Sequence, residues 1–152
     1  MGLLTDIRAV ITVMYPDATT IFSNKFNANL KSFSVEEADL PLIVIDNERD
    51  KDNEIKQNNN VQKDSKVLIS ILDLDATGNT DDQSETIRAE MEAIADRLAV
   101  QIYQLLPARP VGNQKYTNTP MFHVFNTNLT GVALEMRVNY NEVVSFKKEL
   151  VT

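Results

Sequence analysis

The chain has 152 residues, 43% of them hydrophobic and 24% charged, with no cysteine and a formal net charge of −7 at pH 7. This length suits one domain with its own core, and the lack of cysteine excludes disulfides, thiolate metal sites and cysteine nucleophiles. The acidic balance, with no stripe of Lys and Arg, argues against a protein that grips nucleic acid. No apolar run is long enough to span a membrane. The N-terminal MGLLTDIRAVITVMYP lacks the basic start and cleavage site of a signal peptide, so we expect an intracellular or virion protein.

The N-terminal half predicts one helix, one short strand and two polar segments. Apolar residues at helical spacing predict a helix over residues 3–14, which Pro16 ends. Residues 17–41 mix spaced aromatic residues with Asn and Ser, and they fit either a helix or a loosely structured arm. The run Leu42–Ile45 predicts a short strand. Residues 46–66, DNERDKDNEIKQNNNVQKDSK, are almost wholly polar. We prefer a hairpin arm that reaches beyond the domain to a solvated loop, because long structureless loops are uncommon.

The C-terminal half predicts a long helix between strands. Val67–Leu72 predicts a strand that is apolar on both faces. Residues 82–106 carry apolar side chains in steps of three and four, with charged residues on the other side, as is typical of an amphipathic helix. A long loop, a strand and an alternating strand follow, the last two paired as an antiparallel hairpin: residues 107–120, 121–125 and 132–144.

These elements predict an α+β fold in which a mostly antiparallel four-stranded sheet packs against one long helix plus an N-terminal helix. Residues 1–152 form one domain in this prediction, with the long polar arm at about 46–66. A single helix layer covers only one face of an antiparallel sheet. The second face therefore needs another cover, which the N-terminal helix or a neighbouring subunit would supply.

The stretch LISILDLDATGN, residues 68–79, admits three interpretations. In the first, Asp73, Asp75 and Thr77 form the Asp-x-Asp-x-Thr loop of a haloacid-dehalogenase phosphatase. There the first aspartate is a nucleophile and the second a general acid, and both need a magnesium ion. A motif of such common residue types often arises by chance.

The other parts of that phosphatase family are hard to find in the chain. A Ser or Thr after a second strand would come from Met121–Thr127, and the required Lys would be Lys115 or Lys147. No acidic pair follows any later predicted strand, and too little chain remains for the parallel sheet of the family. These gaps argue against the phosphatase interpretation.

In the second interpretation, the same aspartates together with Gly78 open a calcium loop of the EF-hand kind. Such a loop needs Glu at its twelfth position and a helix before it. Ser84 occupies that position, Glu85 comes one residue late, and a strand is predicted before the loop. The carboxylates leave weak cation binding open, but they do not predict a dedicated site.

In the third interpretation the stretch is a strand end, a turn at Gly78 and the start of a helix. Thr80 and Gln83 have the spacing of a capping box, and acidic residues in the first turn suit the helix dipole. This interpretation needs no special chemistry, and we take it as the default. The acidic residues at the start of the helix are Asp81, Asp82 and Glu85, whereas Asp73 and Asp75 belong to the end of the strand and the turn.

Other catalytic groups are scarce. His123 is the only histidine and lies in a predicted strand, where a structural role is expected. One histidine and no cysteine give no zinc signature, and four isolated glycines form no phosphate-binding loop. We therefore predict no catalytic, cofactor-binding or metal-binding residues, no cofactor, and a protein that is not an enzyme.

The order of elements resembles the tail terminator or tail-completion (head–tail joining) proteins of long-tailed bacteriophages. The resemblance covers most of the chain and rests on pattern and order. The stretches that carry it are an N-terminal helix (LLTDIRAVITVMY), a Leu-Pro entry into a strand (LPLIVID), a strand with an Asp-rich turn (VLISILDLDATG), a long helix (ETIRAEMEAIADRLAVQIYQLL) and a closing hairpin (FHVFNTNLTGVALEMRVNY).

The resemblance implies a structural virion protein without catalytic residues. Such subunits form a ring, usually a hexamer, that caps the tail tube, ends its polymerisation and joins the tail to the head connector. The implied partners are further copies of the chain, the tail tube protein and the head–tail connector protein, with no membrane. The implied location is the tail or neck of the virion, and the host cytoplasm during assembly.

An acidic ring fits this picture, because subunits that each carry −7 would let DNA pass through the lumen without sticking. Three alternatives stay open. The chain would otherwise be another phage neck or connector ring protein, a non-phage interaction module, or a magnesium-dependent phosphatase with an aspartate nucleophile.

Overall fold

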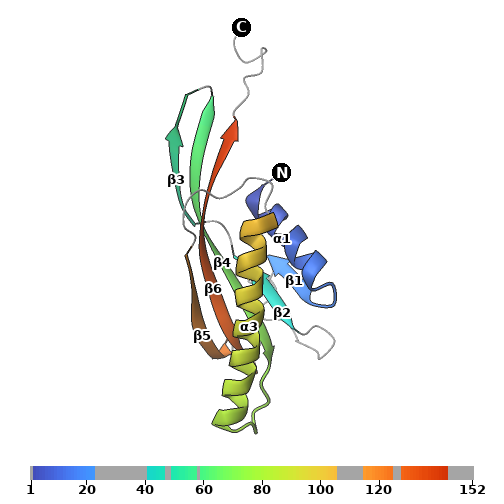
Figure 1. Ribbon diagram of the computed structural model, residues 1–152. Coiled ribbons are helices and arrows are strands. Elements are labelled where there is room, and N and C mark those ends of the chain that lie inside the picture. The colour runs from blue at the N-terminus through green and yellow to red at the C-terminus, as the bar shows by residue number, and fades with distance from the viewer. Residues whose placement is uncertain are drawn as a thin grey trace.

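The computed structural model describes residues 2–22, 41–46, 49–57, 59–105, 115–124 and 128–143. Over these residues two helices and six strands form an α+β fold (Figure 1). The helices are α1 (Leu3–Met14) and α3 (Asp81–Leu105). The strands are β1 (Thr19–Phe22), β2 (Leu42–Ile45), β3 (Arg49–Ile55), β4 (Asn60–Leu74), β5 (Tyr116–Val124) and β6 (Leu129–Val143).

All six strands belong to one mixed sheet with the order β1-β2-β4-β6-β5, and β3 pairs with β4. The β1–β2 pairing is parallel, whereas the other pairings are antiparallel. The α+β class is therefore confirmed, but the predicted sheet of four strands is too small. β1 was missed because its partner β2 lies 23 residues further along the chain, as the pair Thr19 and Leu42 shows, with no local pattern to link them. β3 was missed as a strand of the sheet because its sequence, RDKDNEI, has no apolar alternation.

Both helices lie on the same face of the sheet (Figure 1). The 3.6-residue period gives α1 a buried stripe, and α3 buries Met91, Leu98 and Ile102 along its length. These side chains share one core with alternate residues of β2, β4 and β6. The suggestion that the N-terminal helix covers the second face is therefore wrong, because α1 packs beside α3 and β1.

The second face of the sheet carries a smaller buried cluster. Strand alternation sends Ile43 and Ile45 of β2 to the helix face and leaves Leu42 and Val44 on the other. The second cluster is completed by residues of β1, β4, β5 and β6: Ile21, Leu72, Met121 and Leu129. β2 is thus buried on both sides, as its uninterrupted apolar run indicates.

Within residues 46–66, β3 and the start of β4 form an antiparallel hairpin, in agreement with the arm interpretation. The end of β6 continues along β4 to the pair Asn60–Val143, so that three strands extend beyond both helices (Figure 1). The Asn60 N–H donates to the carbonyl oxygen of Gln57 at 3.3 Å in the turn. Asn59 has φ 60°, a left-handed conformation that asparagine tolerates well. We call this three-stranded extension the arm.

The predicted helices and the strand β2 agree closely with the structure, whereas β4, β5 and β6 run longer than predicted. α1 matches residues 3–14, and α3 begins and ends one residue before the predicted 82–106. β4 begins at Asn60 and not at Val67, because its first half lies in the arm and shows no apolar pattern. β5 begins inside the predicted loop 107–120, of which residues 107–114 lie outside the described part. The middle of the 17–41 segment, residues 23–40, also lies outside it.

Among the described residues, neither helix is long and apolar enough to cross a membrane.

Candidate functional site

Asp75, at the end of β4, is fully buried and has hydrogen-bond donors at both carboxyl oxygens. Its Oδ2 accepts a hydrogen bond from the Thr130 hydroxyl at 2.7 Å, and its Oδ1 accepts one from the Asn79 side-chain amide at 2.8 Å. The Asp75 backbone N–H donates to the carbonyl oxygen of Asn128 at 2.6 Å. This carboxyl therefore ties the end of β4 to the start of β6 and to the turn before α3.

Asp73 and Thr77 make other contacts, although Thr77 shares its partner Asn128 with the backbone of Asp75. Asp73 Oδ1 accepts a hydrogen bond from the backbone N–H of the next residue, Leu74, at 2.8 Å. The Thr77 hydroxyl lies 3.4 Å from Asn128 Oδ1. A phosphatase loop needs two carboxylates that face one phosphate and one metal ion. Here one carboxyl is closed off from solvent, so the motif does not form a common site.

Of the remaining phosphatase candidates, the described Lys115 lies far from Asp73. Lys115 precedes β5, whose first residue is level with Met136 on β6, whereas Asp73 is level with Thr130. Six residues of an extended strand separate these two positions, roughly 20 Å at 3.3 Å per residue. Lys147 and residues 125–127 lie outside the described part of the chain. His123 belongs to β5, but its side chain is not among those described.

The turn interpretation agrees with the observed contacts. The Thr80 N–H donates to Gln83 Oε1 at 2.8 Å, and the Gln83 N–H donates to Thr80 Oγ1 at 3.3 Å, which is a reciprocal capping box. Asp81 and Asp82 occupy the first turn of α3, and a strand precedes the loop where an EF-hand has a helix. Among the described residues, no three or more His, Cys, Asp or Glu side chains gather to hold a metal ion.

A hollow of about 460 Å³ lies where the first turn of α3 faces β5. It is lined by Phe122, which is 46% exposed, and by residues of α3: Asp81, Asp82, Ser84 and Glu85. Its acidic residues are exposed, and Asp81 and Asp82 belong to the first turn of α3, with Glu85 directly after them. The helix dipole favours acidic side chains at the N-terminus of a helix, so these residues do not by themselves indicate a binding site.

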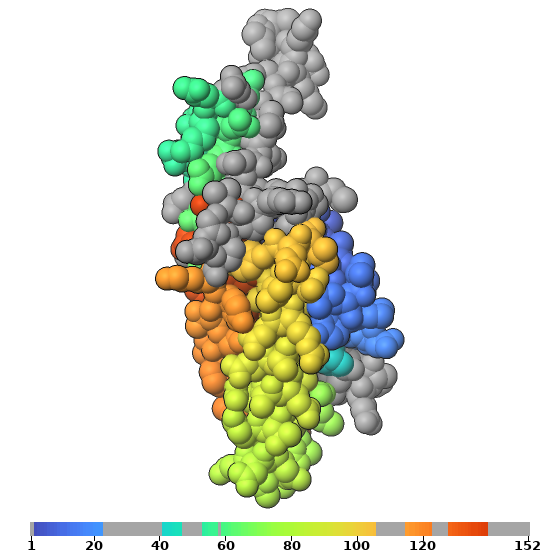
Figure 2. Space-filling view, in the orientation of Figure 1, coloured from blue at the N-terminus to red at the C-terminus, as the bar shows by residue number. Residues whose placement is uncertain are grey.

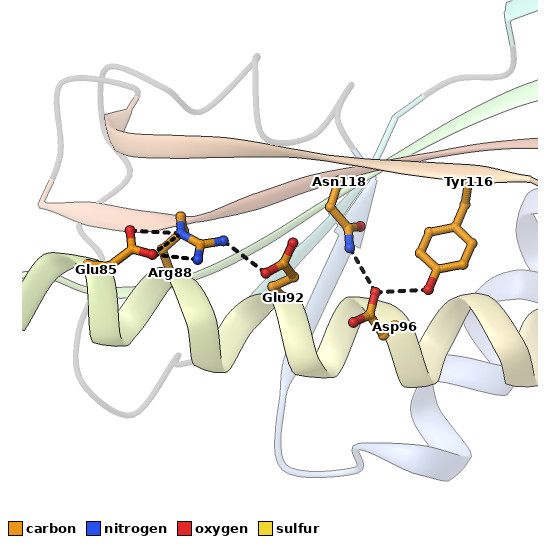
Figure 3. Close-up of polar contacts among 6 residues, drawn as sticks. All are labelled: Glu85, Arg88, Glu92, Asp96, Tyr116 and Asn118. Atoms are coloured by element: carbon orange, nitrogen blue, oxygen red, sulfur yellow. Dashed lines mark hydrogen bonds and ion pairs between the residues drawn. The ribbon is translucent and has the colours of Figure 1, made fainter.

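A second polar group joins α3 to β5 (Figure 3). Asp96 Oδ1 accepts hydrogen bonds from the Tyr116 hydroxyl at 3.0 Å and from the Asn118 side-chain amide at 2.8 Å. The bond to Asp96 raises the pKa of the Tyr116 phenol, and partial burial adds to the effect. The sequence pattern had placed Asp96 on the solvent side of the helix. Its partners are more than 19 residues away in sequence, so no local spacing signals the contact.

Along α3, Arg88 lies between two carboxylates (Figure 3). Its Nε donates to Glu85 at 2.9 Å, and its Nη1 donates to Glu92 Oε2 at 3.0 Å. The hydrogen bond from Arg88 lowers the pKa of Glu85, and both acidic partners raise the pKa of Arg88. Pairs at these spacings stabilise helices. The shifted pKa values of Glu85 and Arg88 therefore follow from ion pairs that stabilise α3, and they do not require a catalytic role.

Tyr103 anchors the C-terminal end of α3 to the sheet. Its hydroxyl lies 3.1 Å from the carbonyl oxygen of Arg137 on β6 and 3.3 Å from that of Lys115 before β5. Burial raises the pKa of Tyr103 to about 12. The sequence gives no signal for this contact, because both acceptors are backbone carbonyls whose position depends on how the helix packs.

No protein-family model matches the chain, and a search of curated proteins finds no match.

Proposed function

We propose that this chain is a structural subunit of a phage virion. In this proposal, a ring of about six copies caps the tail tube, ends its polymerisation and joins the tail to the head connector. The support comes from the order of helices and strands and from the arm. The tail tube and the head connector are proposed as partners because of the family resemblance alone. The contacts of the described residues support self-assembly, but they do not identify the partner proteins.

The observation that carries the proposal is the arm itself, a polar ribbon that reaches beyond both helices. Gln62 donates to Asn139 at 2.9 Å across β4 and β6, and Arg137 donates to Asp64 at 3.0 Å. Such cross-strand contacts contribute about 0.2–1 kcal/mol each. They keep the arm extended without a hydrophobic core of its own. Long polar extensions on a rigid scaffold are usually functional, and in this protein we assign the arm to contact between subunits.

The acidic character of the chain suits a channel for DNA. Exposed carboxylates lie along α3 at Asp81, Asp82, Glu85 and Glu90. With a net charge of −7 per subunit, a ring that turns such residues toward its lumen would repel phosphate and let DNA slide. DNA would thus be a passing contact and not a bound ligand.

We assign no catalytic role to the Asp-rich turn. The buried carboxyl of Asp75 accepts hydrogen bonds from Thr130 and Asn79, and these contacts connect β4 with β6 and α3. In the phosphatase motif the second aspartate is the general acid, which must come within hydrogen-bond reach of the leaving group, whereas the carboxyl of Asp75 is fully buried. A structural role for Asp75 explains the same residues without that chemistry.

Light scattering over a range of protein concentrations, with and without magnesium, tests the proposal. We expect a discrete oligomer of about six subunits, whose mass does not depend on the metal and which shows a central opening in negative-stain electron microscopy. A monomer that hydrolyses a phosphomonoester only with magnesium, and loses this activity in Asp73→Asn, would contradict the proposal. The same Asp73→Asn variant should assemble normally if the proposal holds.

A further inference from the structure

The pairing of β4 with β6 fixes which way each backbone group of β6 faces. The Asp75 N–H donates to the Asn128 carbonyl oxygen, so these two residues occupy a hydrogen-bonded position of the ladder. Such positions alternate along an antiparallel pair. Because the register of β4 and β6 shows no shift, the even residues of β6 direct their N–H and C=O groups to β4, and the odd residues direct theirs to the other side.

The odd side of β6 is open in the arm. β5 pairs with this side only as far as Tyr116, which is level with Met136. Among the described residues, no strand lies beside β6 beyond that point. The residues whose backbone N–H and C=O groups face this open edge are Asn139, Asn141 and Val143.

β1, β3 and β5, which form the other edges of the described sheet, are each protected against a further strand. In β5, Pro120 falls at a position that faces outward and has no N–H to donate, and the register shifts between Met121 and Val124. In β3, five of the seven residues are charged, and the register shifts between Arg49 and Asp52. β1 has only four residues. Proline, bulges, charge and short length all prevent the pairing of edge strands.

The open stretch of β6 has none of these protections. Residues 139–143, NYNEV, contain one charged residue and no proline, and their register with β4 is regular. Tyrosine and valine favour strands. An unprotected edge of this kind accepts another strand through backbone hydrogen bonds. The edge is therefore a docking surface for an extended strand.

The spacing of the open groups fits a second copy of the same stretch. Asn139 and Val143 are equidistant from Asn141, so an antiparallel copy pairs Asn139 with Val143 of its partner and Asn141 with its own equivalent. Every open N–H and C=O group of both copies then gains a partner. In this register Glu142 lies opposite Tyr140, and no like charges face each other.

The same symmetric pairing is unfavourable for β3. In the registers centred on Lys51, Asp52 or Asn53, an acidic residue always lies opposite another acidic residue. Like charges that are directly opposite destabilise a sheet. Self-pairing through the arm is therefore favoured at β6 and disfavoured at β3.

The shape of the molecule leaves room for this contact. Figure 1 and Figure 2 both show the arm beyond the ends of α1 and α3, directed away from the body. In an antiparallel pair of arms, the two bodies lie at opposite ends of the joined strands. The helices of one copy therefore do not collide with those of the other.

We propose that residues 139–143 of β6 pair antiparallel with the same residues of a second copy, about a two-fold axis at Asn141. This inference rests on the assignment of the arm to contact between subunits, and it specifies the strand that makes the contact. An isologous contact closes on two copies, so a ring of about six subunits also needs a second contact elsewhere.

A single cysteine at the two-fold axis tests the pairing directly, because the chain has no cysteine of its own. Asn141→Cys brings two equivalent Cα atoms to about 5.5 Å, a separation that a disulfide can bridge. Asn53→Cys is the matched control, since Asn53 is an exposed asparagine of β3 in the same arm. After mild oxidation, a non-reducing gel should show a cross-linked dimer for Asn141→Cys and none for Asn53→Cys.

A proline at the same position measures how much the pairing contributes. The Asn141 N–H faces away from β4, so Asn141→Pro removes a donor of the contact and no hydrogen bond of the arm's own ladder. It should raise the concentration at which paired copies half-dissociate by about tenfold or more. Asn53 also faces away from its partner strand, and Asn53→Pro should change this concentration less than about threefold. Circular dichroism checks that both variants are folded.

The contrary outcomes separate this pairing from the ring proposal. A cross-link that forms only when Asn141→Cys is mixed with Asn53→Cys would mean that β6 pairs with β3 of another copy. A discrete wild-type oligomer with no cross-link in Asn141→Cys overturns the pairing and leaves the ring proposal standing. A cross-linked pair that never forms a larger assembly supports the pairing and contradicts the ring. Equal effects of the two proline variants, or a wild type that stays monomeric at every concentration, overturn the pairing.

Discussion

Replacing Asp75 by alanine should destabilise the protein strongly, because its carboxyl is buried and accepts two hydrogen bonds. Asp75→Ala removes the acceptors of the Thr130 hydroxyl and the Asn79 amide, at 2.7 and 2.8 Å. Each lost hydrogen bond costs about 1 kcal/mol, and a buried hydroxyl that loses its acceptor adds about 1–3 kcal/mol. The expected loss in the free energy of unfolding is therefore about 3–5 kcal/mol.

Asp73→Ala provides the comparison within the same motif. Its carboxyl is half-buried and accepts one local hydrogen bond from the backbone of Leu74, so the expected loss is about 1 kcal/mol or less. The assay is urea unfolding followed by far-ultraviolet circular dichroism, since the chain has no tryptophan to report by fluorescence. Protein concentration must be the same for all variants, because self-association adds to apparent stability.

One pattern of results would refute this reasoning. If the free energy of unfolding of Asp75→Ala lies within about 0.5 kcal/mol of the wild-type value, the buried hydrogen bonds of Asp75 do not stabilise the fold. Active-site carboxylates often reduce stability, and removing one can leave stability unchanged or raise it. A stable Asp75→Ala protein with lost magnesium-dependent hydrolysis would therefore return the Asp-rich turn to a catalytic interpretation.

Three further predictions concern Gly131 in the sheet, Gly78 in the turn after β4, and Tyr103 on α3. A Cβ at Gly131 would overlap the backbone carbonyl oxygen of Ile71 in the central β4–β6 pair, so Gly131→Ala should lower the free energy of unfolding by about 3 kcal/mol or more. Gly78→Ala, with no atom within 4 Å of the added Cβ, should leave it within about 1 kcal/mol in the same urea assay. Burial raises the pKa of Tyr103 from 10.0 to about 12. The neutral phenol therefore stabilises the folded state fully below about pH 10, and this contribution is lost as the pH rises through about 12. With partial exposure to solvent, the contribution should be roughly 1 kcal/mol. Between pH 9 and 11.5, the wild type should lose that much more stability than Tyr103→Phe, and parallel pH curves for the two proteins would contradict the assignment.

The helices and the capped turn were predictable because their signals are local. The 3.6-residue period of apolar side chains located α1 and α3 to within one residue. The capping box at Thr80 and Gln83 needs only a spacing of three, and the structure has both of its hydrogen bonds. The polar composition of residues 46–66 likewise indicated a hairpin outside the core.

The candidate site was only partly predictable. Asp73 and Asp75 look equivalent in sequence, yet one accepts a local hydrogen bond and the other is buried against Thr130, 55 residues further along the chain. Asp96 shows the same limit, because the helical pattern assigned it to solvent while the fold places Tyr116 and Asn118 beside it. Local spacing carries no information about which strand lies beside a helix.

By itself the sequence determined where the helices begin and end, the turn after β4 and the polar character of the arm, since each depends on residues within a few positions of one another. The tertiary structure alone decided the parallel pairing of β1 with β2, the position of α1 beside α3 on one face, and the burial of Asp75. These features depend on contacts between segments distant in the chain. Such contacts form only when the whole sheet pairs in register and closes over a common core.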